Sequence, residues 1–195
     1  MARTKQKATN KHVTKKKIPG WKSYFLESLE GDLDDFVHNG MELRSDELVD
    51  EFEDEYLDGE KATTKEWGIV EDIQDTVIKL NKVSSKFIDH LYDLEESEST
   101  GLLRRRSPSR SRSSKGSWKM NLLADLEYSL DDFGHNGYDI DTDIIKQAKN
   151  SADDSDATIS EKDMKMLHEM EKEAKTINEY IKKYLKLMDE MEKSR

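Results

Sequence analysis

The residues with the clearest potential for chemistry are two pairs of Asp and His. Asp34 and His38 stand four residues apart, and Asp131 and His135 repeat that spacing. Side chains four apart lie on one face of a helix, so each pair could offer two ligands to a metal ion. Two ligands do not complete a metal site, and the helix dipole already favours a His near a helix C-terminus. The sequence therefore predicts capped helix ends here and no metal centre.

Other arrangements of catalytic residues are missing from the sequence. The chain has no Cys, which excludes disulfides, thiolate metal ligands and a Cys nucleophile. It also lacks a Gly-rich phosphate loop, a nucleophile elbow and the ligand spacing of a zinc site. We therefore expect no enzymatic activity and no cofactor, and a function that consists of binding partners.

Both Asp–His pairs belong to a segment that occurs twice. Residues 21–40 read WKSYFLESLEGDLDDFVHNG and residues 118–137 read WKMNLLADLEYSLDDFGHNG, with twelve of the twenty positions identical. The offset of 97 residues continues without insertion into the apolar positions that follow. Because an internal repeat decides the architecture, we predict two copies of one module, at 21–97 and 118–195.

Each module is predicted to be all-α, with three helices. The first helix has apolar residues at helical spacing, and its predicted core residues are Trp21, Leu29, Leu33 and Phe36 in copy one and Trp118, Leu126, Leu130 and Phe133 in copy two. We expect Asn-Gly at residues 39–40 and 136–137 to end this helix, since both residue types tolerate a left-handed C-cap. A second, shorter helix follows, and residues 53–62 and 150–159 are predicted to be loops.

The third helix of each module is predicted to be the longest. Thr63 with Glu66, and Ser160 with Asp163, have the spacing of a capping box, which is weaker with Asp than with Glu. Side chains then recur at alternating spacings of 3 and 4, typical of a coiled-coil seam: Val70, Ile73, Val77, Leu80, Ser84, Phe87, Leu91 and Leu94, matched by Leu167, Met170, Ala174, Ile177, Ile181, Tyr184, Met188 and Met191. A helix of about 32 residues is about 48 Å long, more than two short helices can cover. We expect the two long helices to pack together within one chain, or self-association between chains.

Basic segments alternate with the acidic modules, within a net charge of -11. Residues 1–20 carry seven basic and no acidic side chains, and residues 101–117 carry six and none. Such segments are predicted to be a disordered tail and a disordered linker, the latter at 98–117, that serve in interactions. Opposite charge favours their folding back onto the modules when no partner is present. No apolar run suits a membrane span or a signal peptide, so we expect a soluble protein with no membrane partner.

The residues after Met1 carry one resemblance to a known family. Ala2-Arg3-Thr4-Lys5-Gln6 resembles the start of the amino-terminal tail of histone H-three. The resemblance covers these five contiguous residues and ends at Lys7. It implies that histone-tail readers bind residues 2–6, with phosphorylation of Thr4 and methylation of Lys5 as modifications that change the reader. A basic tail for solubility or nuclear import is the alternative interpretation.

Two basic clusters indicate a nuclear location. Lys15, Lys16 and Lys17 form one, and Arg104, Arg105 and Arg106 form the other. The second lies in a short tract that resembles the arginine–serine segments of splicing factors. Ser107, followed by Pro108, resembles a site for a proline-directed cell-cycle kinase. A phosphate there would add about -1.5 to -2 charge to a basic segment and so change its partner.

Together these features predict a nuclear, chromatin-associated adaptor. Its tail recruits histone-tail readers, and its helical repeats bind partners or a second copy. Two alternatives stay open. The first is an acidic, histone-binding or chaperone-like protein, in which residues 50–60 attract basic tails. The second is a structural coiled-coil subunit of a larger nuclear complex.

Overall fold

The computed structural model describes residues 19–44, 48–57, 59–104, 118–153 and 159–194. All regular structure in these ranges is helical, with no strands, so the predicted all-α class is confirmed. The elements are α1 Gly20–Asp34, α2 Leu48–Glu51, the π-helical turn η1 Phe52–Tyr56, α3 Thr64–Arg104, α4 Trp118–Asp131, α5 Thr142–Asp153 and α6 Glu161–Lys193. None of the helices in the described ranges has the length and hydrophobicity of a membrane span.

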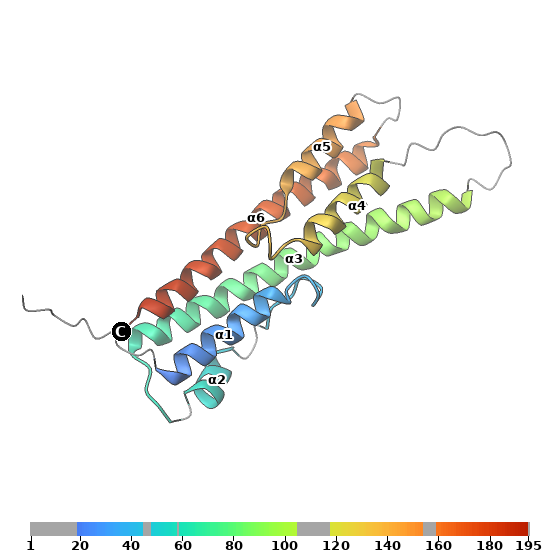
Figure 1. The fold of residues 1–195 in the computed structure, drawn as a ribbon. Coiled ribbons are helices and arrows are strands. Elements are labelled where there is room, and N and C mark those ends of the chain that lie inside the picture. The colour runs from blue at the N-terminus through green and yellow to red at the C-terminus, as the bar shows by residue number, and fades with distance from the viewer. Residues whose placement is uncertain (1–18, 45–47, 58, 105–117, 154–158, 195) are drawn as a thin grey trace, which may run out of the picture.

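The two long helices, α3 and α6, lie side by side and run in opposite directions along the body (Figure 1). Helices α1 and α2 lie at the end where α3 begins, and α4 and α5 lie towards the other end. The short helices are shared between the long ones, since α1 packs against α6 and α4 against α3, whereas α2 packs against α3 and α5 against α6. Each first helix therefore contacts the long helix of the other half of the chain.

The predicted seam lies between α3 and α6. Most of its positions are buried: Val70, Ile73, Val77, Leu80, Ser84, Phe87, Leu94, Leu167, Met170, Ala174, Ile177, Ile181, Tyr184 and Met191, while Leu91 and Met188 are partly buried. The spacing of 3 and 4 places one stripe of each helix towards its partner, and burying this stripe stabilises the pair. The two seams thus cover each other within one chain.

The first helix ends earlier than the sequence predicts. Helix α1 stops at Asp34, and a turn carries the chain to residue 40. The turn closes through two backbone bonds, from the Met41 amide to the Phe36 carbonyl at 2.7 Å and from the Gly40 amide to the Val37 carbonyl at 3.2 Å. This is a Schellman motif, which requires a left-handed residue. Gly40 supplies it with φ of 72°.

The second copy of the segment forms the same turn. After α4, the Tyr138 amide donates to the Phe133 carbonyl at 2.9 Å, and Gly137 has φ of 73°. Of each Asn-Gly pair it is the glycine that is left-handed, and a second left-handed residue follows it, Met41 or Tyr138. That geometry turns the side chain back onto the preceding Phe, and the rings of Phe133 and Tyr138 lie 5.7 Å apart.

The predicted loops are partly helical. Residues 53–56 belong to η1, in which the Leu57 amide reaches the Phe52 carbonyl at 3.2 Å. The wider turn buries Phe52 beside Trp21 and Trp67, at ring distances of 5.3 Å and 5.0 Å. This aromatic packing overrides the acidic composition that predicts a loop. In the other half, α5 likewise extends to Asp153, beyond residue 150 where a loop was predicted.

The start of α3 follows the sequence prediction. The Thr63 amide donates to Glu66 Oε2 at 2.7 Å, and the Glu66 amide donates to Thr63 Oγ1 at 3.3 Å, so this capping box is complete. At α6 the Asp163 amide donates to Ser160 Oγ at 3.1 Å, but the shorter Asp side chain accepts the Ser160 hydroxyl instead. Helix α3 continues past residue 97, where the linker was expected, and ends at Arg104.

Candidate functional site

Most of the candidate residues in the basic segments lie outside the described residues. These are Ala2 to Gln6, Lys15 to Lys17, Arg105, Arg106 and Ser107. Arg104 is the last residue of α3.

The predicted core residues of the first helices face the interior. Trp21, Leu29, Leu33, Phe36, Leu126 and Phe133 are buried, and Trp118 and Leu130 are partly buried. Phe36 and Phe133 contact each other, with ring centroids 5.6 Å apart. These two residues lie 97 positions apart in the sequence, so identical residues from the two halves meet in the core.

The two Asp–His pairs are not brought together as ligands. His38 and His135 are exposed, whereas Asp34 accepts the Tyr138 hydroxyl at 2.6 Å. This hydrogen bond, helped by partial burial, raises the pKa of Tyr138 to about 12. Within the described ranges, no group of three or more His, Asp or Glu side chains is placed to hold a metal ion.

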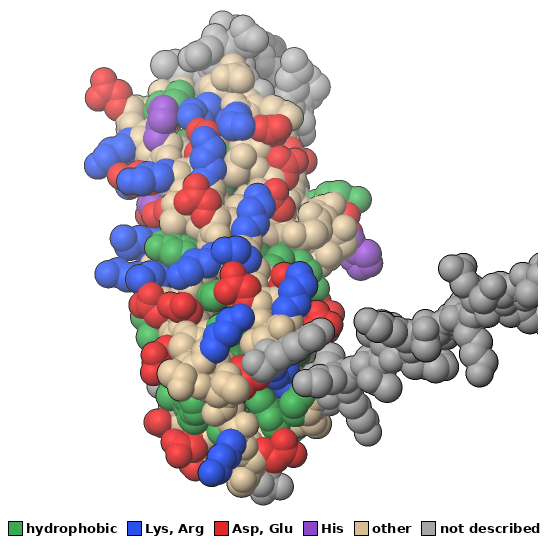
Figure 2. All heavy atoms as spheres, turned by 90° about the vertical axis from the view of Figure 1, so that its left-hand side faces the viewer, with side chains coloured by type: hydrophobic (Ala, Val, Ile, Leu, Met, Phe, Trp, Pro, Cys, Tyr) green, Lys and Arg blue, Asp and Glu red, His purple; other side chains and the backbone are tan. Residues whose placement is uncertain are grey.

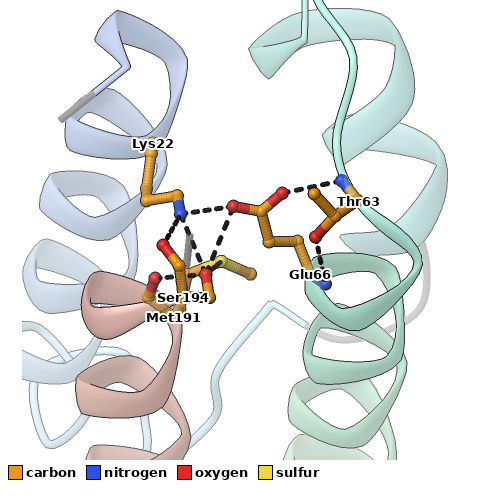
Figure 3. Close-up of polar contacts among 5 residues, drawn as sticks. All are labelled: Lys22, Thr63, Glu66, Met191 and Ser194. Carbon is orange, nitrogen blue, oxygen red and sulfur yellow. Dashed lines mark hydrogen bonds and ion pairs between the residues drawn. The ribbon is translucent and has the colours of Figure 1, made fainter.

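A buried ion pair, absent from the sequence predictions, joins three helix ends (Figure 3). The Lys22 ammonium is 2% exposed and pairs with the Glu66 carboxylate. It also donates to the Ser194 carbonyl at 2.8 Å and to its hydroxyl at 2.9 Å. Burial disfavours the charge on Glu66, but the hydrogen bonds from Lys22 and Thr63 outweigh burial and lower its pKa to about 2. The Glu66 carboxylate is ionised at neutral pH, and both side chains of the pair are fully hydrogen-bonded, which suits a structural role.

The other half of the chain contains a related pair. Lys119 donates to Asp163 at 2.9 Å and to the Ser97 hydroxyl at 3.0 Å. Burial opposes the charge on Asp163, but hydrogen bonds from Lys119 and Ser160 prevail and hold its pKa below the usual range. This pair is more accessible, with 14% and 20% of the two side chains exposed. The sequence contained a signal for both pairs, because the Lys, the acidic residue and the Ser of one pair each have a counterpart of the same kind at the offset of 97: Lys22 and Lys119, Glu66 and Asp163, Ser97 and Ser194.

Two asparagines bind the backbone in matching ways. Asn81 accepts the Leu43 amide at 3.0 Å and donates to the Leu43 carbonyl at 2.7 Å. Asn178 does the same with Ile140, at 2.9 Å for both bonds. Each amide ties the segment after the left-handed turn to the long helix of its own half. These positions also stand 97 apart, and the sequence analysis did not single them out.

A groove of about 390 Å³ separates the exposed sides of α1 and α6. It is lined by Ser23, Leu26, Glu27, Glu30, Leu33, Tyr138, Leu185, Met188, Asp189 and Glu192. Its apolar floor consists of partly buried or buried side chains, and its acidic side chains are exposed. An apolar floor with carboxylates at its rim fits a basic segment that also carries apolar side chains. We refer to this feature as the acidic groove.

Charge is mixed on much of the rest of the body. On the face shown in Figure 2, basic and acidic side chains alternate, with hydrophobic side chains between them. A second hollow between α3 and α6, of about 560 Å³, is likewise mixed: His90 lies 2.9 Å from Glu173, and Lys86 and Lys172 also line it. A third hollow is lined by Asp139, Asp141 and Asp143 together with Ile140 and polar side chains. Among these hollows, the acidic groove is the one that combines carboxylates with a floor of several apolar side chains. Comparison of the chain with protein families, with curated proteins and with solved structures found no match.

Proposed function

We propose that the protein is a non-enzymatic, nuclear, chromatin-associated adaptor whose residues 2–6 recruit readers of the histone H-three tail. The observation that carries this proposal is the sequence Ala2-Arg3-Thr4-Lys5-Gln6, which resembles the start of that tail. In this proposal the helical body holds the tail and binds further partners. The basic clusters at residues 15–17 and 104–106 would direct the protein to the nucleus.

We also propose that the body is a tandem pair of one three-helix module. The support comes from contacts that recur at the offset of 97: the Lys22 and Lys119 pairs, the Asn81 and Asn178 backbone contacts, and the left-handed turns at Gly40 and Gly137. Helices α3 and α6 already bury each other's seam. The body therefore does not need a second chain to cover that seam. Partner binding then falls to the tail and to the exposed surface.

The chemistry of residues 2–6 suits recognition as an extended peptide. Removal of Met1 would leave a free amine on Ala2, followed by the Arg3 guanidinium and the Lys5 ammonium. A reader can add such a segment to the edge of a sheet and hold the amine among carbonyl groups. Methylated Lys5 would enter an aromatic cage, with cation–π attraction of about 0.5–2 kcal/mol. Phosphate on Thr4 would place acceptor oxygens beside Arg3 and select another reader.

Calorimetry with a peptide of residues 2–12 and a purified reader of the histone H-three terminus tests the proposal. We expect binding that is lost when one residue is added before Ala2. A peptide of residues 10–20, which keeps Lys15 to Lys17, is the matched basic control and should not bind. Binding that survives the extension, or equal binding of the control, would reduce the tail to a basic patch. Intact mass of the purified full chain shows whether Met1 is removed.

A second candidate function is binding of basic histone tails by the acidic body. It is favoured by Glu53, Asp54 and Glu55, which are consecutive and exposed on η1. Replacing all three by Gln would abolish capture of histone tails under this second candidate and would leave reader binding intact under the first. Deleting residues 2–6 should have the opposite effects, so the pair of variants separates the two functions.

A further inference from the structure

We infer that the acidic groove between α1 and α6 is a binding site for residues 1–18 of the same chain. This intramolecular site does not depend on the proposed recruitment of histone-tail readers. The inference assigns the basic tail a defined place on the body. Opposite net charge by itself would favour contact of the tail with any acidic surface.

The groove offers two kinds of contact. Glu27 and Glu30 project from α1, and Asp189 and Glu192 from α6, so the carboxylates belong to both walls. Asp189 pairs with Lys193 at 2.5 Å, and both side chains are exposed, so a basic ligand can take the place of Lys193. The floor between these walls is apolar: Leu26, Leu33, Leu185 and Met188. A ligand that matches this groove needs several positive charges and a few apolar side chains.

Residues 1–18 have that composition. They include seven basic side chains and no acidic one, with Val13 and Ile18 as the sizeable apolar side chains after Met1. Pro19 connects the segment to α1, which begins at Gly20, and the groove begins at Ser23. From Ser23 to Leu33 the helix rises about 15 Å, whereas 18 extended residues can span about 60 Å. The tail is therefore long enough to turn back and follow the whole groove.

The other half of the chain provides an internal comparison. At the offset of 97, Glu27 corresponds to Ala124 and Asp189 corresponds to Tyr92, which is 65% exposed. Ser23 corresponds to Met120, which is 49% exposed. The positions on α4 and α3 that match the acidic groove are thus less acidic and more apolar. The two surfaces have diverged, and the carboxylate-rich one includes the helix that directly follows the tail.

A spin label on the tail of the full chain tests the site. Because the native chain has no Cys, Thr9→Cys gives one attachment point without changing the charge. Two methionine methyl groups serve as NMR reporters: Met188 in the groove, and Met120 on the corresponding surface of the other half, at the position that matches Ser23. We expect the oxidised label to cause loss of the Met188 signal relative to the reduced label, with the Met120 signal retained, and recovery of Met188 at high salt.

Matched variants make the test specific. Glu27→Ala with Asp189→Tyr installs the residues that the other half already has at these positions, and should restore the Met188 signal. Asp125→Ala with Glu127→Ala removes the same number of exposed acids from α4 and should leave the loss at Met188 unchanged. Equal loss at both methyl groups, no loss, or insensitivity to the first variant would overturn the inference. In a mixed sample, isotope-labelled chains without a spin label are combined with spin-labelled chains that carry no isotope. Loss of the Met188 signal in that sample would place the tail of a second copy in the groove, and this result would also overturn the inference.

Discussion

Lys22 is a charged side chain inside a small helical body, 2% exposed and bonded to Glu66 and Ser194. Removing an ammonium and a carboxylate from water is costly, and attraction between them offsets the cost only when both groups are well bonded. Here the ammonium has an acceptor for each of its protons, and the carboxylate also caps α3 through Thr63. The pair therefore fixes where α1, α3 and α6 meet more than it adds to net stability.

Replacing Lys22 by Met should be strongly destabilising, because it leaves the Glu66 carboxylate buried without its partner. We expect a loss of about 3–5 kcal/mol in the free energy of unfolding, measured by urea denaturation. Lys119→Met is the matched control and should cost less, since its side chain and that of Asp163 are more exposed. A larger loss for Lys119→Met would contradict the role assigned to burial.

The same junction predicts a dependence of stability on pH. The folded-state pKa of Glu66 is about 2, below its ordinary value of 4.5. A lowered pKa means that the ionised group stabilises the fold at pH values above 4.5, and that this contribution is lost as the pH falls from about 4.5 to about 2. Urea midpoints measured at pH 6 and pH 3 should therefore differ less in Glu66→Gln than in the wild type. Glu171, with a pKa also of about 2, keeps some of the dependence. Glu60→Gln, at an exposed position, should retain the full difference.

At the scale of elements, the left-handed turns after α1 and α4 set the direction of the chain towards α2 and α5. In the first of them Gly40 adopts a φ of 72°, and the amide of Asn81 holds the backbone of Leu43 just beyond. A residue with a Cβ is strained at this φ, whereas glycine is not. The backbone conformation of the turn thus depends on Gly40, and the position of the segment that follows the turn depends on the Asn81 side chain from α3.

Gly40→Ala should destabilise the protein by about 1 kcal/mol, because alanine is strained in the left-handed region. Gly31→Ala is the control. Gly31 lies within α1, where a Cβ would meet no other atom within 4 Å, so alanine there should stabilise by about 0.5–1 kcal/mol. Thermal unfolding followed by circular dichroism gives both values. A stabilising Gly40→Ala would show that the turn does not need the left-handed residue.

Features encoded locally could be predicted from the sequence. The spacing of Val70, Ile73 and Val77 depends on helix geometry alone, and the Thr63–Glu66 box depends on neighbours three residues apart. The π-helical turn at Phe52 could not be predicted from the sequence. Its i to i+5 hydrogen bond accompanies packing of Phe52 against Trp21 and Trp67, which are not sequence neighbours of Phe52. The acidic groove was missed for the same reason, since its walls come from opposite ends of the chain.

At the scale of the whole molecule, α3 and α6 form one shared core and not two separate ones. Leu80 and Ile177 are both fully buried in the seam between these helices. Side chains from both halves therefore supply the apolar contacts that hold either half. Unfolding should be one cooperative process, as in small single domains.

Leu80→Asp and Ile177→Asp should each destabilise both halves together, by about 4 kcal/mol or more, since a buried unpaired charge is among the costliest substitutions. Trp fluorescence in Trp118→Phe and in the double variant Trp21→Phe, Trp67→Phe reports each half during urea unfolding. The two transitions should coincide and shift together. Ile78→Asp, at a position that is 46% exposed on α3, is the control with little effect. A stable, fully helical monomer made of residues 118–195 alone would refute the shared core.

The contact between Lys22 and Ser194 also means that the start of α1 and the end of α6 are neighbours, as the start of α4 is a neighbour of Ser97. Which half comes first along the chain is therefore a matter of covalent connection and not of packing. A circularly permuted chain that runs from residue 118 to 194, crosses a short Gly–Ser linker and continues from residue 19 to 104 should form the same helical body. Circular dichroism and methionine methyl NMR spectra that match those of the native order would demonstrate it.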